Sequence, residues 1–103
     1  MIVHVENAKQ FDDLTKQGRV LVDFWAPWCG PCRMLGPVLE QIDAEGKELT
    51  VLKVNVDEQG ELAARFSVYS IPTMILYNEG KIVGTKVGYI PKGPLEAWAL
   101  NTK

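Results

Sequence analysis

Strand-like and helix-like patterns of apolar residues alternate along this chain. Residues 20–25 are almost continuously apolar, as in a central strand that is buried on both faces of a sheet. A second β-rich run covers residues 49–56, and Val3 and Val5 predict a short strand near the start. The pattern therefore predicts three strands in the first half of the chain, each followed by a stretch of different periodicity.

The first two of these stretches have helical spacing. Asn7 is predicted to cap the first helix, with Gln10 three residues further on, and Gly18 to end it. The second helix follows the second cysteine and ends near Gly46. Pro37 lies inside it and is expected to kink it.

Two shorter helices complete the pattern. One is predicted around residues 61–66, and the last is introduced by Gly93 and Pro94, with the proline in the first helical turn. The apolar positions predicted to face the core are Ala8, Phe11 and Leu14 in the first helix, Met34, Leu35, Val38, Leu39 and Ile42 in the second, Leu62, Ala63 and Phe66 in the third, and Leu95, Trp98 and Ala99 in the fourth.

Residues 73–77 and 81–83 flank Asn78-Glu79-Gly80, which predicts a hairpin with a glycine-containing turn. The predicted order is therefore β-α-β-α-β-α-β-β-α. Parallel pairing in the first half and an antiparallel hairpin in the second predict an α/β fold, with a mixed sheet of five strands and helices on both faces.

Composition limits the class of protein. The 103 residues suit one domain, 1–103, and 47% of them are hydrophobic, enough for a packed core. The net charge is −2, with no charge run that would favour nucleic acid or a membrane surface as partner. The N-terminal residues show no leader pattern and no stretch approaches a membrane span, so we expect a cytoplasmic protein.

Both cysteines of the chain, Cys29 and Cys32, lie between the predicted strand 20–25 and the second helix. Two cysteines at such a turn can switch between dithiol and disulfide with little rearrangement, which points to redox chemistry. A purely structural disulfide is the first alternative, but closing a four-residue loop stabilises the fold by only about 2 kcal/mol. Zinc is the second alternative; a structural site needs four ligands, and this pair with the single His4 supplies at most three.

The motifs also carry a resemblance that covers essentially all of the chain. The matching residues are WAPWCGPC at positions 25–32, Asp23, Lys53, Ile71-Pro72-Thr73 and Lys86-Val87-Gly88. In these residues the chain resembles the thioredoxin family. The resemblance implies the thioredoxin fold and a strongly reducing cysteine pair. Tyr69, Ser70, Pro94 and the short C-terminal tail depart from the family pattern, and these departures bear on the choice of partner rather than on the reaction.

The two cysteines are predicted to play different parts. Cys29 comes at the start of the helix, where free N–H groups and the helix dipole stabilise a thiolate, so it is predicted to be exposed and to attack the substrate. Cys32, one turn later, is predicted to resolve the mixed disulfide. Between them, Pro31 fixes a helical φ and Gly30 leaves room for a substrate backbone, so both are expected to tune the pair.

Asp23 is the one acid in its apolar strand, and burial there should raise its pKa. The resemblance implies that it accepts a proton from Cys32 through water; the alternative is a polar residue satisfied by a partner such as Lys53. Lys53 itself is expected either to tune the site or to be a plain surface charge.

An apolar docking surface for substrate is expected around Cys29. Trp28, Ile71, Pro72 and Gly88 are its predicted substrate-binding residues, together with Pro31. The resemblance implies a cis peptide bond before Pro72, and the Ile71 backbone is expected to pair with an extended substrate segment. Trp25 and Pro37 are expected to be structural residues near the site.

The sequence thus predicts a monomeric thiol–disulfide oxidoreductase that reduces protein disulfides. The resemblance implies recycling by a thioredoxin reductase, with NADPH and FAD acting only through that partner and no cofactor or metal bound here. An oxidase or isomerase of the same fold is one rival, expected to carry a secretion signal and another central dipeptide. A binding module that works without its thiols is the other.

Overall fold

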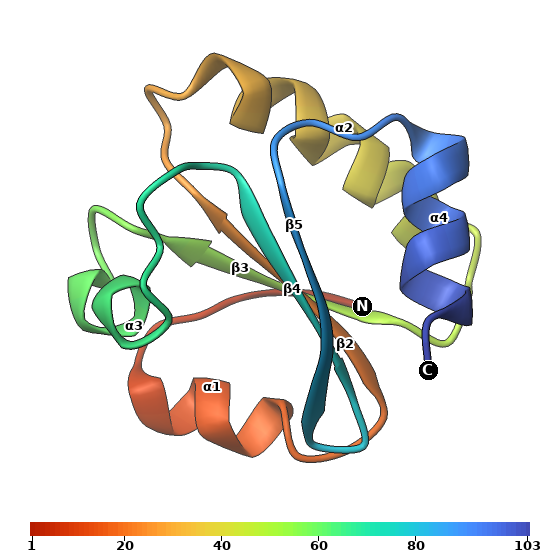
Figure 1. The fold of residues 1–103 in the computed structure, drawn as a ribbon, viewed down its shortest axis with the longest axis horizontal. Helices are drawn as coiled ribbons and strands as arrows, with labels where there is room; N and C mark the ends of the chain where they lie inside the picture. Colours follow the sequence, from red (N-terminus) through yellow and green to blue (C-terminus); the bar gives the residue numbers. More distant parts are fainter.

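A twisted five-stranded sheet forms the centre of the molecule (Figure 1). The computed structural model describes all residues, 1–103. The strands are β1 (Ile2–His4), β2 (Arg19–Trp25), β3 (Thr50–Asn55), β4 (Thr73–Asn78) and β5 (Lys81–Val87). Their order across the sheet is β1-β3-β2-β4-β5, with β1, β3 and β2 parallel and the β4–β5 hairpin antiparallel. The predicted order of elements and the mixed sheet are confirmed.

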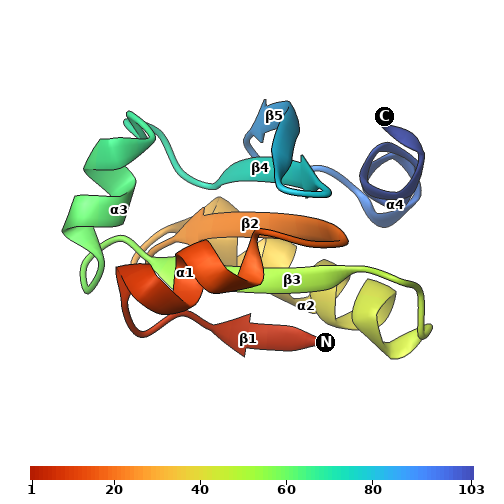
Figure 2. The same ribbon diagram turned by 90° about the horizontal axis from the view of Figure 1, so that it is seen from below.

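Four helices cover the two faces of the sheet (Figure 2). They are α1 (Ala8–Leu14), α2 (Gly30–Ala44), α3 (Gly60–Arg65) and α4 (Lys92–Asn101). One core cluster joins α1 and α3 to one face, and a second joins α2 and α4 to the other. None of the helices is long and apolar enough to cross a membrane.

Strand β2 is central because it is buried on both faces, as its continuous apolar run predicted. Val20, Val22 and Phe24 belong to the core under α1 and α3, whereas Leu21 belongs to the core under α2 and α4. The alternation of side chains along a strand places Asp23 on the same face as Leu21. An ionisable side chain thus lies inside the core beneath α2.

The predicted helix cap of α1 is confirmed, and its predicted end differs by a few residues. The Asn7 side chain accepts a hydrogen bond from the Gln10 N–H at 2.8 Å, which confirms it as the cap of α1. This helix ends at Leu14, before the predicted stop at Gly18. Helix α2 continues through Pro37, which is exposed.

Two positions predicted to face the core do not. Ala8 is exposed at the first turn of α1, and Met34 is 58% exposed on α2. The buried stripe of α2 instead passes through Cys32, Leu35 and Leu39 and continues to Ile42, a spacing of three and four residues that leaves Met34 outside it.

The hairpin turn consists of Glu79 and Gly80, which have φ angles of 51° and 84°. Two successive positive φ angles are typical of the tight two-residue turn whose twist matches that of the flanking strands. The prediction of a glycine-containing turn here is confirmed. The hairpin brings β5 to the edge of the sheet, where its outer residues are mostly exposed.

Candidate active site at the start of helix α2

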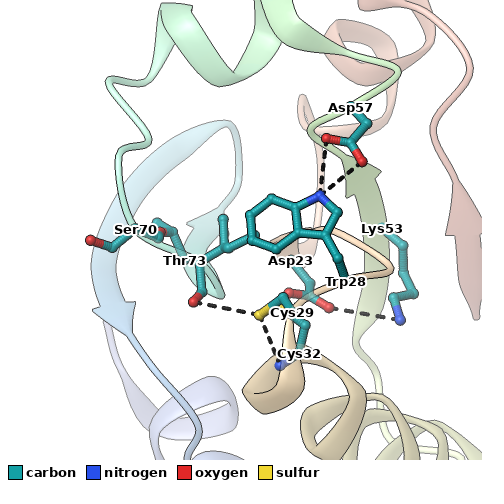
Figure 3. The surroundings of a disulfide bond; sticks show 9 residues. Asp23, Trp28, Cys29, Cys32, Lys53, Asp57, Ser70 and Thr73 are labelled. Atoms are coloured by element: carbon teal, nitrogen blue, oxygen red, sulfur yellow. Dashed lines mark hydrogen bonds and ion pairs between the residues drawn. A yellow bond between two sulfur atoms is a disulfide. The ribbon is translucent and has the colours of Figure 1, made fainter.

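The two cysteines form a disulfide at the junction between β2 and α2 (Figure 3). Cys29 is the N-cap of α2, with an extended backbone, and its sulfur accepts a hydrogen bond from the Cys32 N–H at 3.2 Å. Pro31 occupies the first turn, where its missing N–H would have had no partner in the helix. The Cys29 sulfur therefore takes the place that an oxygen acceptor takes in an ordinary N-cap.

The disulfide is less exposed than the sequence suggested. Cys29 is 6% and Cys32 3% exposed, so the expectation of an exposed Cys29 is wrong for this oxidised form. The physical reason is that Val56 and Ile71, from two other segments, pack with Trp25 around the cysteines. Only the outer edge of the disulfide is open to a partner.

Gly30 and Pro31 lie on the exposed side of this edge. A Cβ atom added at Gly30 would meet no other atom within 4 Å. Gly30 therefore leaves open space above the helix start, as predicted for the approach of a substrate backbone.

The Ile71–Pro72 segment faces the disulfide from the α3–β4 connection. Its peptide bond is cis, as the resemblance implied, and the Ile71 carbonyl oxygen lies 3.7 Å from the Cys29 sulfur. An oxidised sulfur has no proton to donate, so this is a contact rather than a hydrogen bond. Pro72 is itself buried, so its ring adds little to the exposed surface, and Ile71 is half-buried.

Gly88 follows β5 and completes this wall of the site. Its N–H donates to the Pro72 carbonyl oxygen at 2.8 Å, and its φ angle is 96°, a conformation that favours glycine. The hydrogen bond fixes the end of β5 against the cis-proline segment, so the sequence-distant Pro72 and Gly88 lie side by side.

Trp28 directly precedes Cys29 and is 68% exposed. Its indole N–H donates to the Asp57 carboxylate, 3.1 Å to Oδ2 and 3.4 Å to Oδ1 (Figure 3). Asp57 is not among the site residues predicted from the sequence. The predicted parallel pairing of β2 and β3 could have pointed to it, because the segments that follow neighbouring parallel strands leave the sheet at the same edge. In the structure Trp25 of β2 and Asn55 of β3 are register partners, and Trp28 and Asp57 follow them.

Asp23 lies beneath the disulfide and is fully buried (Figure 3). Neither carboxylate oxygen has a hydrogen-bond partner in the protein, and the closest cation is Lys53, with Nζ 3.8 Å from Oδ2. Burial raises the pKa of Asp23 from 3.8 to about 6, although the Lys53 charge opposes part of this rise. The carboxyl is thus poised to exchange a proton near neutral pH.

Lys53 is not a plain surface charge. Its side chain is 16% exposed, and its ammonium lies 4.9 Å from the centre of the Trp25 ring. A Cβ atom added at Gly36, the neighbour of Pro37 in α2, would lie 3.8 Å from Nζ. The ammonium therefore occupies a narrow space between the sheet and α2, where Asp23 is its one anionic neighbour.

These residues supply what disulfide exchange requires. The structure brings together an adjacent pair of sulfurs, a helix N-terminus that favours a thiolate, and a buried carboxyl with a raised pKa. No group of three or more His, Cys, Asp or Glu side chains is arranged to hold a metal ion.

Comparisons with known proteins agree with this geometry. The family model described as Thioredoxin matches residues 2–101. The thioredoxin of Bacillus subtilis strain 168 is 48% identical over 89 residues, which cover 85% of this chain and 86% of the relative. That of Alicyclobacillus acidocaldarius is 54% identical over 79 residues, 76% and 75% of the two chains.

Solved structures give the same answer. A mutant thioredoxin from Halobacterium salinarum NRC-1 superposes with a TM-score of 0.87 at 36% identity, over 95% of this chain and 87% of that one. The oxidised mitochondrial thioredoxin 3 of Saccharomyces cerevisiae also gives a TM-score of 0.87, at 31% identity, over 95% and 92% of the two chains. The chain therefore belongs to the thioredoxin family, and its Cys29–Cys32 pair makes it a protein disulfide reductase that works by dithiol–disulfide exchange.

Proposed function

We propose that Cys29 is the nucleophile of this reductase and Cys32 the resolving thiol. The observation that carries the assignment is the capping geometry: the Cys29 sulfur accepts the Cys32 N–H at the N-terminus of α2. A negative charge on that sulfur is stabilised by the hydrogen bond and by the helix dipole, so the Cys29 thiol ionises more readily than a free cysteine. Cys32 is further inside the protein and has no such position.

The reaction transfers two electrons from the protein to the substrate. The Cys29 thiolate attacks one sulfur of the substrate disulfide, that S–S bond breaks, and the other substrate sulfur leaves as a thiolate that takes up a proton. The Cys32 thiol then loses its proton and attacks the Cys29 sulfur. The mixed disulfide breaks, the second substrate thiol leaves, and the Cys29–Cys32 disulfide remains.

Asp23 is the proposed acceptor of the Cys32 proton, by way of a bridging water molecule. Two features support this role: both of its oxygens are free of protein hydrogen bonds, and its pKa of about 6 leaves it mostly ionised at pH 7. Lys53 is a positioning residue that limits the rise of the Asp23 pKa. Asp23→Asn should keep the fold but slow release of the mixed disulfide. If Asp23→Asn released the mixed disulfide at the same rate as the parent protein from pH 6 to pH 9, the role would be disproved.

The proposed docking surface is the rim of the disulfide. Trp28 supplies an exposed apolar plate held by Asp57, and the backbone of Ile71 faces the Cys29 sulfur. Gly88 supports this segment through Pro72 rather than by a side chain. An extended segment of substrate laid along the Ile71 backbone would bring its disulfide onto Cys29.

A thioredoxin reductase is the proposed electron donor that restores the dithiol, with FAD and NADPH acting in that partner. Residues 1–103 are proposed to act as one domain and as a monomer. The cytoplasm is the proposed location, because a reducing dithiol carrier works where thiols are kept reduced.

Reduction of insulin disulfides, driven by NADPH and a thioredoxin reductase, tests the proposal. We expect turnover by the parent protein and none by Cys29→Ser. Cys32→Ser should instead accumulate a covalent mixed disulfide through Cys29, visible by non-reducing electrophoresis. The assignment of roles would be overturned if Cys29→Ser formed a mixed disulfide on Cys32 as fast as Cys32→Ser forms one on Cys29. Circular dichroism confirms that each variant is folded.

A further inference from the structure

A second hollow lies beside the disulfide rim. It has a volume of about 260 Å³ and is enclosed by the end of α3, the α3–β4 connection and the neighbouring residues of β4 and β5. Thr73 pairs with Val87 and Ile75 with Thr85 across the hairpin, so these side chains form one floor on the face of the sheet that carries α1 and α3. Those helices do not cover β5 there, as Figure 2 shows.

The rim of the hollow carries two of the most exposed apolar side chains of the protein. Tyr69 is 92% exposed and Val87 62% exposed. Single exposed apolar residues are ordinary, but two of them around a concave surface are typical of an interaction site.

The lining also limits what the hollow can bind. It consists of apolar and aromatic side chains together with serine and threonine hydroxyls, and none of its eight residues is charged. It therefore suits a neutral apolar group better than an anion or a cation. Its volume of about 260 Å³ is just below the roughly 300–1,000 Å³ of pockets that hold drug-sized ligands, and it is large enough for one bulky side chain.

The hollow is continuous with the surface that meets the substrate. Ser70, on its rim, directly precedes Ile71, whose carbonyl oxygen touches the Cys29 sulfur, and Val87 directly precedes Gly88. Tyr69 is two residues from Ile71, a span of at most about 7 Å. Residues i and i+2 of an extended segment are about the same distance apart and point to the same side. A substrate cysteine at Cys29 thus places a residue two positions away at the hollow.

We propose that this hollow is a specificity subsite for the protein substrate. It takes an aliphatic or aromatic side chain two positions from the cysteine under attack, and Tyr69 and Val87 close over that side chain. The inference rests on the proposed function, since it assumes that the substrate lies along Ile71. It names the substrate class as disulfides with a bulky apolar neighbour at that position.

Two cystine peptides test the subsite, one with Phe and one with Ser at both positions two residues from the cysteine. We expect the reduced parent protein to have a kcat/KM about fivefold or more higher for the Phe peptide, the effect of an interface contact worth about 1 kcal/mol. Tyr69→Ser and Val87→Ser should each bring that ratio close to one. The ratio compares kcat/KM for the two peptides within one variant, so an effect of the substitution on the reactivity of the Cys29–Cys32 pair cancels.

Ile82→Ser is the matched control. Ile82 is 51% exposed on the same face of β5, but it pairs with Tyr77 at the far end of the hairpin. Ile82→Ser should keep the preference for the Phe peptide. Loss of the preference would show that the peptide binds non-specifically to apolar residues along β5, and it would overturn the subsite. Unchanged ratios in both Tyr69→Ser and Val87→Ser, or no preference in the parent protein, would also overturn it.

Two further measurements separate the remaining outcomes. Failure of the parent protein to reduce either peptide, or a small disulfide such as hydroxyethyl disulfide, would overturn the proposed function itself. Sedimentation equilibrium tests a second copy as the occupant: a dimer that Tyr69→Ser converts to monomer would assign the hollow to self-association and overturn the subsite.

Discussion

Replacing Asp23 by asparagine tests whether the carboxyl is as strongly desolvated as its position indicates. Asp23 is fully buried and has no protein hydrogen-bond donor, and burial raises its pKa from 3.8 to about 6. The folded protein therefore holds this proton up to about pH 6, whereas the unfolded chain releases it near pH 3.8. Between these values the folded state binds more protons, so the free energy of unfolding falls as the pH rises.

The magnitude follows from the two pKa values. Each pKa unit is worth 1.36 kcal/mol, so the full cost of ionising Asp23 in the folded state is about 3 kcal/mol, of which about 2 kcal/mol accumulates between pH 4 and pH 8. Asparagine has no proton to lose. The stability of Asp23→Asn relative to the parent protein should therefore rise by about 2 kcal/mol over that pH range.

Urea unfolding of the oxidised proteins, followed by tryptophan fluorescence at pH 4, 5, 6, 7 and 8, measures this difference. Asp13→Asn is the control. Its exposed carboxyl pairs with Lys9 and Lys16, and the hydrogen bond from Lys9 holds the pKa of Asp13 below its usual value, so the pH dependence should have the opposite sign. A stability difference between Asp23→Asn and the parent protein that stays constant from pH 4 to pH 8 would refute the desolvation argument.

Three substitutions away from the disulfide test the packing that positions it, each by urea unfolding. Gly84→Ala should lower stability by about 1–3 kcal/mol, because the new Cβ would lie 3.0 Å from the Trp98 ring; an unchanged midpoint would mean that the ring moves aside freely. Asn7→Ala should cost about 1 kcal/mol, since it removes the side-chain acceptor of the Gln10 N–H, and Asn7→Ser should restore most of it. Gly80→Ala should cost more than 1 kcal/mol, since its φ is 84° and its Cβ would approach a carbonyl oxygen of the α1–β2 connection to 3.0 Å; equal stability would show that the turn can change type.

Local pattern was sufficient for the elements of the fold. The continuous apolar run of β2, the Asn7 cap and the turn at Gly80 each depend on interactions within a few residues, so the sequence carries them directly. The same holds for the cysteine pair at the start of α2. Met34 was wrongly predicted to face the core because helical spacing alone does not fix which residues at the edge of an apolar stripe are buried.

The sequence by itself determined the chemistry: two cysteines one helical turn apart at a helix start, and one acid in an apolar strand. Tertiary structure decided the environment of that chemistry. Only the pairing of β2 with β3 puts Lys53 against Asp23 and brings Asp57 within hydrogen-bonding distance of Trp28. Only the α3–β4 connection covers Cys29 with Ile71. The reason is physical. Burial, desolvation and the pKa of Asp23 depend on segments far apart in the chain, and no local pattern specifies which of them meet.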